Sequence, residues 1–111
     1  MNKNDFYCEM VLSEKIKVNK VFETEHFLAF HHTRPSFLMH VIVIPKKHIT
    51  SLKELFSDNK ELITEMHEII DYTMRFVEKE FGGCRLTTNI GDLQETKHLH
   101  WHIYYDKAMM K

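Results

Sequence analysis

An alternation of histidine with apolar residues near the end of this chain limits what it can fold into. In the segment KHLHWHIYY, residues 97–105, imidazoles occupy every second position, at His98, His100 and His102. Side chains on a β-strand point alternately to its two faces. The segment therefore predicts a strand with three histidines on one face and Leu, Trp and Ile on the other.

Further strands are predicted by β-branched and aromatic runs along the chain. These runs lie at residues 20–24, 27–32, 40–45 and 84–90. Such residues fit a pleated, half-buried surface better than a helix, and proline ends the run HVIVIP at Pro45 because it cannot donate to a strand ladder. Five strands, counting the histidine segment, are enough for a sheet that forms the centre of one domain.

Two helices are predicted between the third and fourth of these strands. Ser51 and Glu54 have the spacing of a capping box, which opens a short helix. Apolar residues then recur with helical period from about residue 59 to 80, and glycines at 82 and 83 follow as a stop signal. Strands with inserted helices predict an α+β fold with a mostly antiparallel sheet, one long helix and one short helix.

Composition limits the class of protein. The 111 residues allow one domain, 1–111, with a short N-terminal tail of about residues 1–7. Fifteen basic and sixteen acidic residues leave a net charge of −1, so we expect no nucleic acid polymer as a partner. The start, MNKNDFYCEM, lacks the apolar core of a signal peptide, and no apolar run reaches the ~18 residues of a membrane span. With only Cys8 and Cys84 and no C-x-x-C, we expect a cytoplasmic protein with reduced thiols and no membrane association.

Three alternating histidines indicate a catalytic or metal-binding site more strongly than a single histidine would. Each disfavours charging of its neighbours, so the face is kept mostly neutral near neutral pH. Neutral imidazoles bind transition metals or act as nucleophiles and acid–base groups. The metal-dependent hydrolase is the weaker alternative, because H-E-x-x-H is absent and no acidic base stands nearby in sequence. His100, flanked by His98 and His102, fits a central nucleophile with a neighbouring acid.

Several segments in order resemble the histidine triad (HIT) superfamily. HLHWHIY at 98–104 resembles its signature, and FLAFHHTRP and HVIVIPKKH resemble its two preceding active-site strands. Asn89 and Gln94 resemble the Asn and Gln that precede the triad, with Gln94 four residues before His98. The resemblance runs from about Cys8 to Tyr105 and is nearest to the small branch of nucleoside phosphoramidases and nucleotide hydrolases. It implies a single HIT-like α+β domain.

The resemblance also implies a function and roles for the histidines. The expected activity is hydrolysis or transfer at the α-phosphate of a purine nucleotide conjugate, of the phosphoramidate or dinucleoside polyphosphate type, through a nucleotidyl-histidine intermediate. His100 is the expected nucleophile, and His102 assists the leaving group. His98 and His40 orient and support the cluster.

The nucleotide-binding residues implied by the resemblance are His32, Thr33, Asn89, Gln94 and Glu95. His32 stands where the family has a ribose-contacting carboxylate, and Glu95 stands where a hydroxyl residue commonly meets the phosphate. The loop between Asn89 and Gln94 is also shorter than usual. His32 and Glu95 favour an alternative function, a nucleotide-binding regulatory module of the same fold with little or no turnover.

The resemblance also bears on whether the protein binds a metal cofactor. Some relatives bind structural zinc at positions that here read Asp5, Cys8, His48 and His98. Because one of the usual two cysteines is replaced, we favour no tight zinc site, name no metal ligand, and expect catalysis to require no metal.

A homodimer is expected for a separate reason. Tyr72 and Phe76 widen the apolar arc of the long helix to about half its circumference, more than one sheet contact requires. We expect this flank to be buried in a twofold homodimer, as the resemblance also suggests. The alternative is that both side chains pack under the N-terminal tail.

Overall fold

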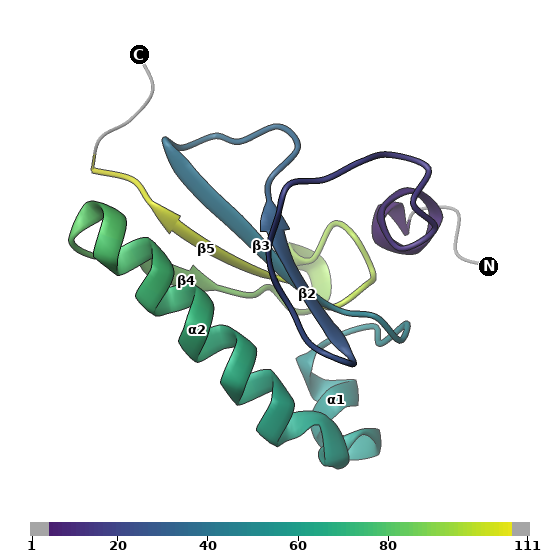
Figure 1. The fold of residues 1–111 in the computed structure, drawn as a ribbon. Helices are drawn as coiled ribbons and strands as arrows, with labels where there is room; N and C mark the ends of the chain where they lie inside the picture. The colour runs from purple at the N-terminus through teal and green to yellow at the C-terminus, as the bar shows by residue number, and fades with distance from the viewer. Residues whose placement is uncertain (1–4, 108–111) are drawn as a thin grey trace.

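The computed structural model describes residues 5–107, and its elements follow the order anticipated from sequence (Figure 1). Three short helical turns, η1, η2 and η3, and two α-helices accompany five strands. The strands are β1 (Lys20–Glu23), β2 (Phe27–His31), β3 (Met39–Pro45), β4 (Arg85–Thr87) and β5 (Trp101–Tyr105). The helical elements are η1 (Tyr7–Val11), α1 (Leu52–Asp58), η2 (Lys60–Leu62), α2 (Ile63–Phe81) and η3 (Gly91–Leu93).

All five strands join in one antiparallel sheet with the order β1-β2-β3-β5-β4. β3 lies in the middle, and its residues from His40 to Pro45 are all buried, as expected for the run HVIVIP. The α+β prediction, with a mostly antiparallel sheet, one long helix and one short helix, is confirmed.

The histidine strand is shorter than the alternation predicts. β5 begins at Trp101, which pairs with Val43, and His98 and His100 lie in the extended segment before it. Two pairs further along this register, Leu99 would face Pro45, which has no N–H to donate. The Leu99 N–H instead bonds to the Ile49 carbonyl, and the Pro45 carbonyl accepts a bond from the His98 ring. Proline thus ends the ladder before it reaches the first two histidines.

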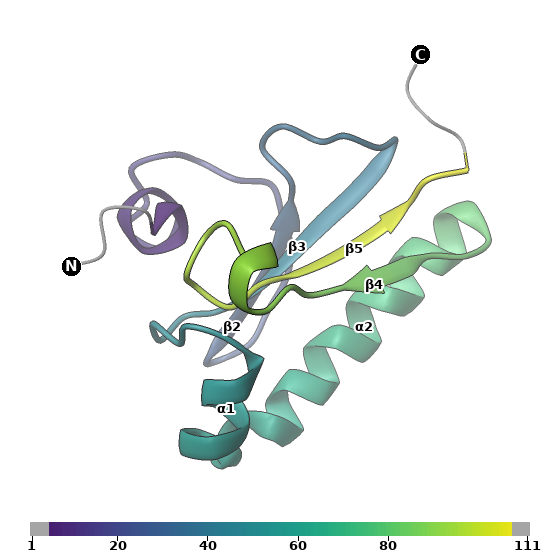
Figure 2. The same ribbon diagram turned by 180° about the vertical axis from the view of Figure 1, so that it is seen from behind.

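Helix α2 lies across one face of the sheet, as Figures 1 and 2 show from the front and from behind. It begins at Ile63 after the η2 turn, later than expected, because the Asn59 side chain accepts a bond from Lys47 and does not cap the helix. It ends where the pattern predicts, at Gly82, whose φ of 92° is left-handed. The packed interface contains Ile69 and Val77 of the helix and Trp101 of the sheet.

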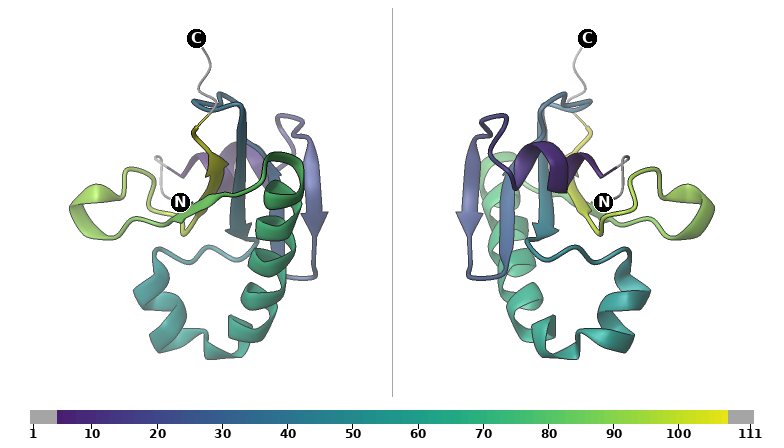
Figure 3. Two further views of the ribbon diagram at one scale, coloured as in Figure 1. Left: turned by 90° about the vertical axis from the view of Figure 1, so that its left-hand side faces the viewer. Right: turned by 90° about the vertical axis from the view of Figure 1, so that its right-hand side faces the viewer.

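The opposite face of the sheet is covered by the N-terminal segment. In the side views, η1 and α2 lie on opposite sides of the sheet (Figure 3). Tyr7 and Val11 pack there against Phe30 and Ile42 of the sheet. The expected tail of residues 1–7 is therefore wrong at its end, since Asp5 and Tyr7 are buried; residues 1–4 lie outside the described part.

The flank of α2 that was expected to form a dimer contact is partly used within the chain, although Tyr72 stays 44% exposed. Tyr72 stacks on Phe22 of β1, with ring centroids 4.1 Å apart. Phe76 meets His31 of β2 edge-to-face. Neither packs under the N-terminal tail, because that segment lies on the other face of the sheet. Within residues 5–107, no helix is long and apolar enough to cross a membrane.

Candidate active site

Three of the expected catalytic histidines, His40, His100 and His102, gather with His32 on the sheet face that η1 covers. Val41 and Val43 of β3 and Trp101 of β5 point toward α2. Because side chains alternate along a strand, His40 and His102 point the other way. In the register of β3 and β5, His40 lies opposite Tyr104 and His102 lies opposite Ile42. The two histidines are therefore diagonal neighbours on this face, with ring centroids 5.1 Å apart.

His100 is held so that one ring nitrogen is free to react. Its Nδ1–H donates to the His98 carbonyl at 2.8 Å, since a carbonyl can only accept. A neutral ring then carries its lone pair on Nε2. Burial lowers the pKa of His100 and outweighs the bond to the carbonyl, which acts to raise it. A buried neutral imidazole with a free Nε2 lone pair is suited to nucleophilic attack.

His102 and His40 form a pair whose protons can be assigned. His40 Nε2 lies 2.9 Å from His102 Nδ1, and His40 Nδ1 is buried with no partner among the described residues. Buried N–H groups without acceptors are rare, so the His40 proton belongs on Nε2, which donates to His102. The His102 proton is then on its own Nε2. Burial, then the neighbouring imidazoles, lowers the pKa of both to about 4.

His32 is the fourth member of this group. Its ring stacks on His40 with centroids 4.4 Å apart, and its Nδ1 accepts the Arg34 backbone N–H at 2.9 Å. The accepting nitrogen places the proton of the neutral ring on Nε2. Burial, followed by repulsion from His100, lowers the pKa of His32.

Two adjoining cavities lie beside these rings. The larger is about 360 Å³ and is lined by Tyr7, His32, Asn89, Leu93, Glu95, Thr96, His100 and His102. The smaller is about 70 Å³ and is lined by Phe6, Tyr7, Phe30, His32, Thr33 and Ile42. The first is polar and the second is mainly apolar. A cavity of about 450 Å³ beside Val11, Lys20 and Lys46 has no histidine among its described lining residues.

The expected nucleotide-binding residues are distributed unevenly around the cavities. His32, Asn89 and Glu95 line the larger cavity, and Thr33 lines the smaller one. Gln94 is buried, and its amide donates to the carbonyls of Thr50 and Thr96. Its two N–H groups are thus already used within the chain, and contact with a nucleotide stays a prediction.

Residues that sequence reasoning did not single out also shape the site. Tyr7 lines both cavities, and its ring centroid is 5.1 Å from that of His100. The Thr88 hydroxyl donates to the His100 carbonyl at 2.8 Å and fixes the backbone of that residue. The aromatic pair Phe6-Tyr7 just before Cys8 was the available signal, but its position near the chain start favoured a tail.

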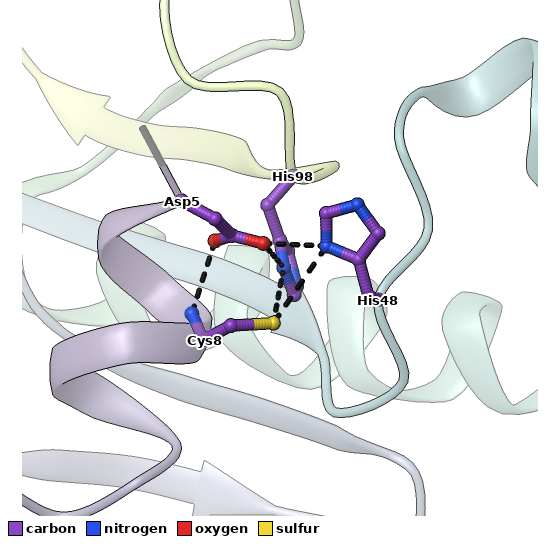
Figure 4. A group of neighbouring side chains, drawn as sticks. All are labelled: Asp5, Cys8, His48 and His98. Carbon is purple, nitrogen blue, oxygen red and sulfur yellow. Dashed lines mark hydrogen bonds and ion pairs between the residues drawn. The ribbon is translucent and has the colours of Figure 1, made fainter. Parts of the chain in front are cut away.

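A second polar group lies beside the triad, where η1 meets the sheet (Figure 4). It consists of Asp5, Cys8, His48 and His98, whose side-chain ligand atoms all lie within 4.8 Å of one another. Cys8 Sγ is 3.4 Å from His98 Nδ1 and 3.6 Å from His48 Nδ1. In tetrahedral zinc sites, bond lengths of ~2.0–2.3 Å place ligand atoms ~3.3–3.6 Å apart. The two sulfur–nitrogen separations therefore fit a zinc ion, whereas Asp5 Oδ2 lies nearer to His48 Nδ1 and His98 Nδ1, at the hydrogen-bond distances of 2.5 and 3.0 Å.

The charges in this group also fit a cation. His98 Nε2–H donates to the Pro45 carbonyl at 2.9 Å, so a neutral His98 carries a lone pair on Nδ1. That nitrogen lies 3.0 Å from Asp5 Oδ2 in a fully buried place. Burial acts to raise the pKa of Asp5, but hydrogen bonds from Cys8, and from His98 when its Nδ1 is protonated, outweigh it and keep the pKa low. Two acceptors facing each other require a proton or a metal ion between them.

Cys8 behaves differently with and without such an ion. Burial, followed by its contact with the Asp5 carboxylate, raises the pKa of the Cys8 thiol to about 12. Without a cation the thiol therefore stays protonated at neutral pH. A bound metal ion deprotonates a coordinating thiol. The group is a possible Asp/Cys/His/His metal site.

The chain belongs to the HIT family. The HIT domain model matches residues 13–108, which is most of the chain. An uncharacterised HIT-like protein from Chlamydia muridarum is 33% identical over 100 residues, covering 86% of this chain and 76% of the relative. The family resemblance seen in the histidine segment is thus confirmed.

Two further relatives have names that state an activity. A solved HIT family hydrolase from Legionella pneumophila is 29% identical, with a TM-score of 0.74 and coverage of 96% of each chain. An adenosine 5′-monophosphoramidase from Mus musculus is 26% identical over 107 residues, covering 92% of this chain and 63% of the relative.

Proposed function

We propose that this protein is a hydrolase or nucleotidyl transferase that cleaves at the α-phosphate of a purine nucleotide conjugate. The single observation that carries the proposal is the pair of ring nitrogens beside the larger cavity. His100 offers an Nε2 lone pair, and His102 offers an Nε2–H, each assigned by the partner of the other ring nitrogen. A nucleophile beside an acid is what a two-step group transfer needs.

In the first step, His100 Nε2 attacks the α-phosphorus and forms a phosphorus–nitrogen bond. The bond from phosphorus to the leaving group breaks, His102 Nε2–H donates a hydrogen bond to the departing oxygen or nitrogen, and that atom takes up a proton from water as it leaves. The His100 ring becomes positively charged, and the His98 carbonyl, which accepts its Nδ1–H, stabilises that charge. His40 supports His102 by donating to its Nδ1.

In the second step, water attacks the phosphorus and releases a proton to solvent, and the electron pair of the phosphorus–nitrogen bond returns to His100. The released nucleoside monophosphate is the product. The leaving group is of the phosphoramidate or dinucleoside polyphosphate type. His32, Asn89 and Glu95 contact the phosphate and ribose, and the apolar cavity beside Phe30 and Thr33 receives part of the base. Gln94 shapes the loop that carries Glu95.

We further propose that Asp5, Cys8, His48 and His98 hold a structural zinc ion. Bound there, the ion supplies positive charge that joins η1 to the sheet. The four ligand atoms and the two facing acceptors support this assignment. His100 and His102 carry out the reaction themselves, so we expect catalysis without a metal at the phosphate.

A homodimer is also proposed, but through a different surface from the one that the helix pattern favoured. β4 is an edge strand, all three of its residues are exposed, and Leu86 and Ile90 are exposed apolar side chains on and beside it. Exposed edges with apolar side chains are sites for pairing with another strand. A second copy paired about a twofold axis covers both groups at once.

A nucleotide-binding module with little turnover remains the second candidate. Glu95 brings a carboxylate to the cavity that receives the phosphate, and His32 offers a single N–H to the ribose. Both features weaken the hold on an ordinary nucleotide substrate.

Acid-quenched intact-mass analysis after mixing with an adenosine phosphoramidate separates the two functions. We expect one adenylyl adduct at early times, release of adenosine monophosphate later, and no adduct in the His100→Asn variant. Release of product by the His100→Asn variant at the wild-type rate contradicts the mechanism. Binding with neither adduct nor product supports the regulatory module instead.

A further inference from the structure

One short segment carries parts of both the metal group and the nucleotide cavity. Asp5 and Cys8 belong to the metal group, and Tyr7, between them, lines both cavities. Figure 4 shows Asp5 and Cys8 projecting from the start of η1 toward His48 and His98. A change at either site therefore acts on the same turn of the chain.

We propose that a metal ion on Asp5, Cys8, His48 and His98 and a nucleotide in the adjoining cavities bind cooperatively. The ion fixes the segment that carries Tyr7, and Tyr7 completes the wall against which the nucleotide binds. The inference rests on the proposed function for its second ligand. It assigns the metal group a role in substrate affinity and names Tyr7 as the coupling residue.

The first link is the position of Tyr7. Its side chain is only 7% exposed, although it lies near the start of the described chain. Its ring centroid lies 5.1 Å from His100, 5.7 Å from His98 and 6.2 Å from Phe30. Aromatic rings at such distances make favourable edge and tilted contacts. Tyr7 thus stands between the metal group and the nucleophile.

The second link is His98, which contacts both sites with different atoms. Its Nδ1 belongs to the metal group, and its carbonyl accepts the Nδ1–H of His100. Its Nε2–H is held by the Pro45 carbonyl. An ion on Nδ1 therefore holds the His98 ring at its second nitrogen as well. The carbonyl that sets the direction of the His100 ring belongs to the same residue.

The segment depends on such contacts because it is short. η1 contains five residues, whereas isolated helices below ~12–15 residues are marginal in water. Tyr7 and Val11 anchor it by apolar contacts, and Asp5 anchors it through the metal group. With no metal ion, only a proton can bridge Asp5 Oδ2 and His98 Nδ1. A ligand that orders this segment lowers the ordering cost for the second ligand, which gives positive cooperativity.

The test measures affinity rather than turnover. Isothermal titration gives the Kd of adenosine monophosphate for protein stripped with a chelator and for the same protein with one equivalent of zinc chloride. We expect zinc to tighten binding by ~5- to 150-fold, the usual range of coupling between sites. Reciprocity requires the nucleotide to tighten zinc binding by the same factor, measured by competition with a zinc-binding dye.

The two cysteines provide a matched pair of variants. Both are partly buried, but Cys84 lies near the end of α2, where its Sγ faces the Met74 carbonyl. Cys84→Ser should keep the full effect of zinc on nucleotide affinity. Cys8→Ser should lose the effect while keeping the nucleotide affinity of the stripped protein. Tyr7→Ala should bind zinc as the wild type does and lose the coupling, and Tyr7→Phe, which keeps the ring, should retain it.

The outcomes separate this inference from the proposed function. Equal nucleotide affinities with and without zinc overturn the coupling and leave the proposed function standing. Failure of the nucleotide to bind either form overturns the proposed function. In that case hydrogen exchange at residues 5–11 decides the role of the ion: protection on adding zinc chloride supports a fixed segment, and unchanged exchange overturns it.

Discussion

At the scale of single residues, the hydrogen-bond partners decide what each histidine can do. His98 and His100 lie two positions apart, yet one donates to the Pro45 carbonyl and the other to the His98 carbonyl. The first keeps its Nδ1 for the metal group, and the second keeps its Nε2 for the cavity. The same residue type thus serves two different sites because different nitrogens are occupied.

His100→Asn should abolish turnover of an adenosine phosphoramidate while changing nucleotide Kd little. Asparagine is close in size to imidazole and can donate to the His98 carbonyl, but its amide nitrogen has no lone pair for attack. Turnover by product release and Kd by titration measure the two effects separately. Near-wild-type kcat in the variant would show that another group is the nucleophile.

Glu95 should select substrates that carry a positive charge beyond the phosphate. It is exposed at the larger cavity, and Lys97, its sequence neighbour two positions on, donates instead to the carbonyls of Gly91 and Gln94. An ionised carboxylate can only accept, so it disfavours a phosphate and favours an amine.

Glu95→Ser should raise kcat/KM for neutral-amide or polyphosphate substrates and lower it for conjugates with a cationic leaving group. Asp92→Ser is the control, because Asp92 is exposed on the same loop but does not line the cavity. Equal effects of Glu95→Ser on kcat/KM for both substrate classes would show that Glu95 does not select between them.

At the scale of elements, Gly82 ends α2 in a backbone conformation that other residues adopt with strain. Its φ is 92°, and its N–H bonds to the Glu78 carbonyl. Gly82→Ala should lower the free energy of unfolding by ~1 kcal/mol, measured by urea denaturation.

Gly83→Ala is the matched control for this substitution. A Cβ at either glycine meets no atom within 4 Å, so sterics from neighbours are equal and only the left-handed φ of Gly82 differs. Equal losses in the two variants would show that the helix end does not depend on that conformation.

At the scale of the whole molecule, buried histidines make stability depend on pH. The pKa of His40 and of His102 is lowered to about 4, whereas an unfolded chain takes up these protons near pH ~6.5. Between these values the unfolded state binds more protons, so the free energy of unfolding should fall as pH drops from 6.5 toward 4. Above pH 7 these groups should contribute no further change.

Urea denaturation between pH 7.5 and 4.5 measures this dependence. His40→Gln should flatten it, since glutamine does not titrate. His67→Gln should leave the pH dependence of stability unchanged, because His67 is exposed on α2 in the folded protein. A wild-type stability that is constant from pH 7 to 5 would contradict the burial of neutral imidazoles.

The molecule should also be a dimer at micromolar concentration. Leu86→Asp places a charge on the exposed edge strand β4 and should convert a dimer to a monomer in sedimentation experiments. Leu38→Asp is the control, because Leu38 is also an exposed leucine but precedes β3. A wild-type monomer would contradict the proposal directly.

The family fold and much of the candidate site could be predicted from the sequence because they depend on local periodicity. Alternation placed Trp101 under α2 and His102 on the other face, and the glycines marked the end of the helix. The start of β5 was missed because it depends on Pro45, a residue of the neighbouring strand, and not on the histidine segment itself.

Tertiary structure alone brought distant residues together. Asp5 and His98 are 93 positions apart, and Asp5 and His48 are 43 apart, so no local pattern relates them. Tyr7, which was expected to belong to a tail, forms part of the cavity wall because its ring packs against Phe30 and Ile42 of the sheet. Tyr72, which the helical pattern assigned to a dimer contact, stacks on Phe22 of β1. Periodicity assigns each side chain to a face of its own element, whereas the path of the chain between elements decides what that face meets.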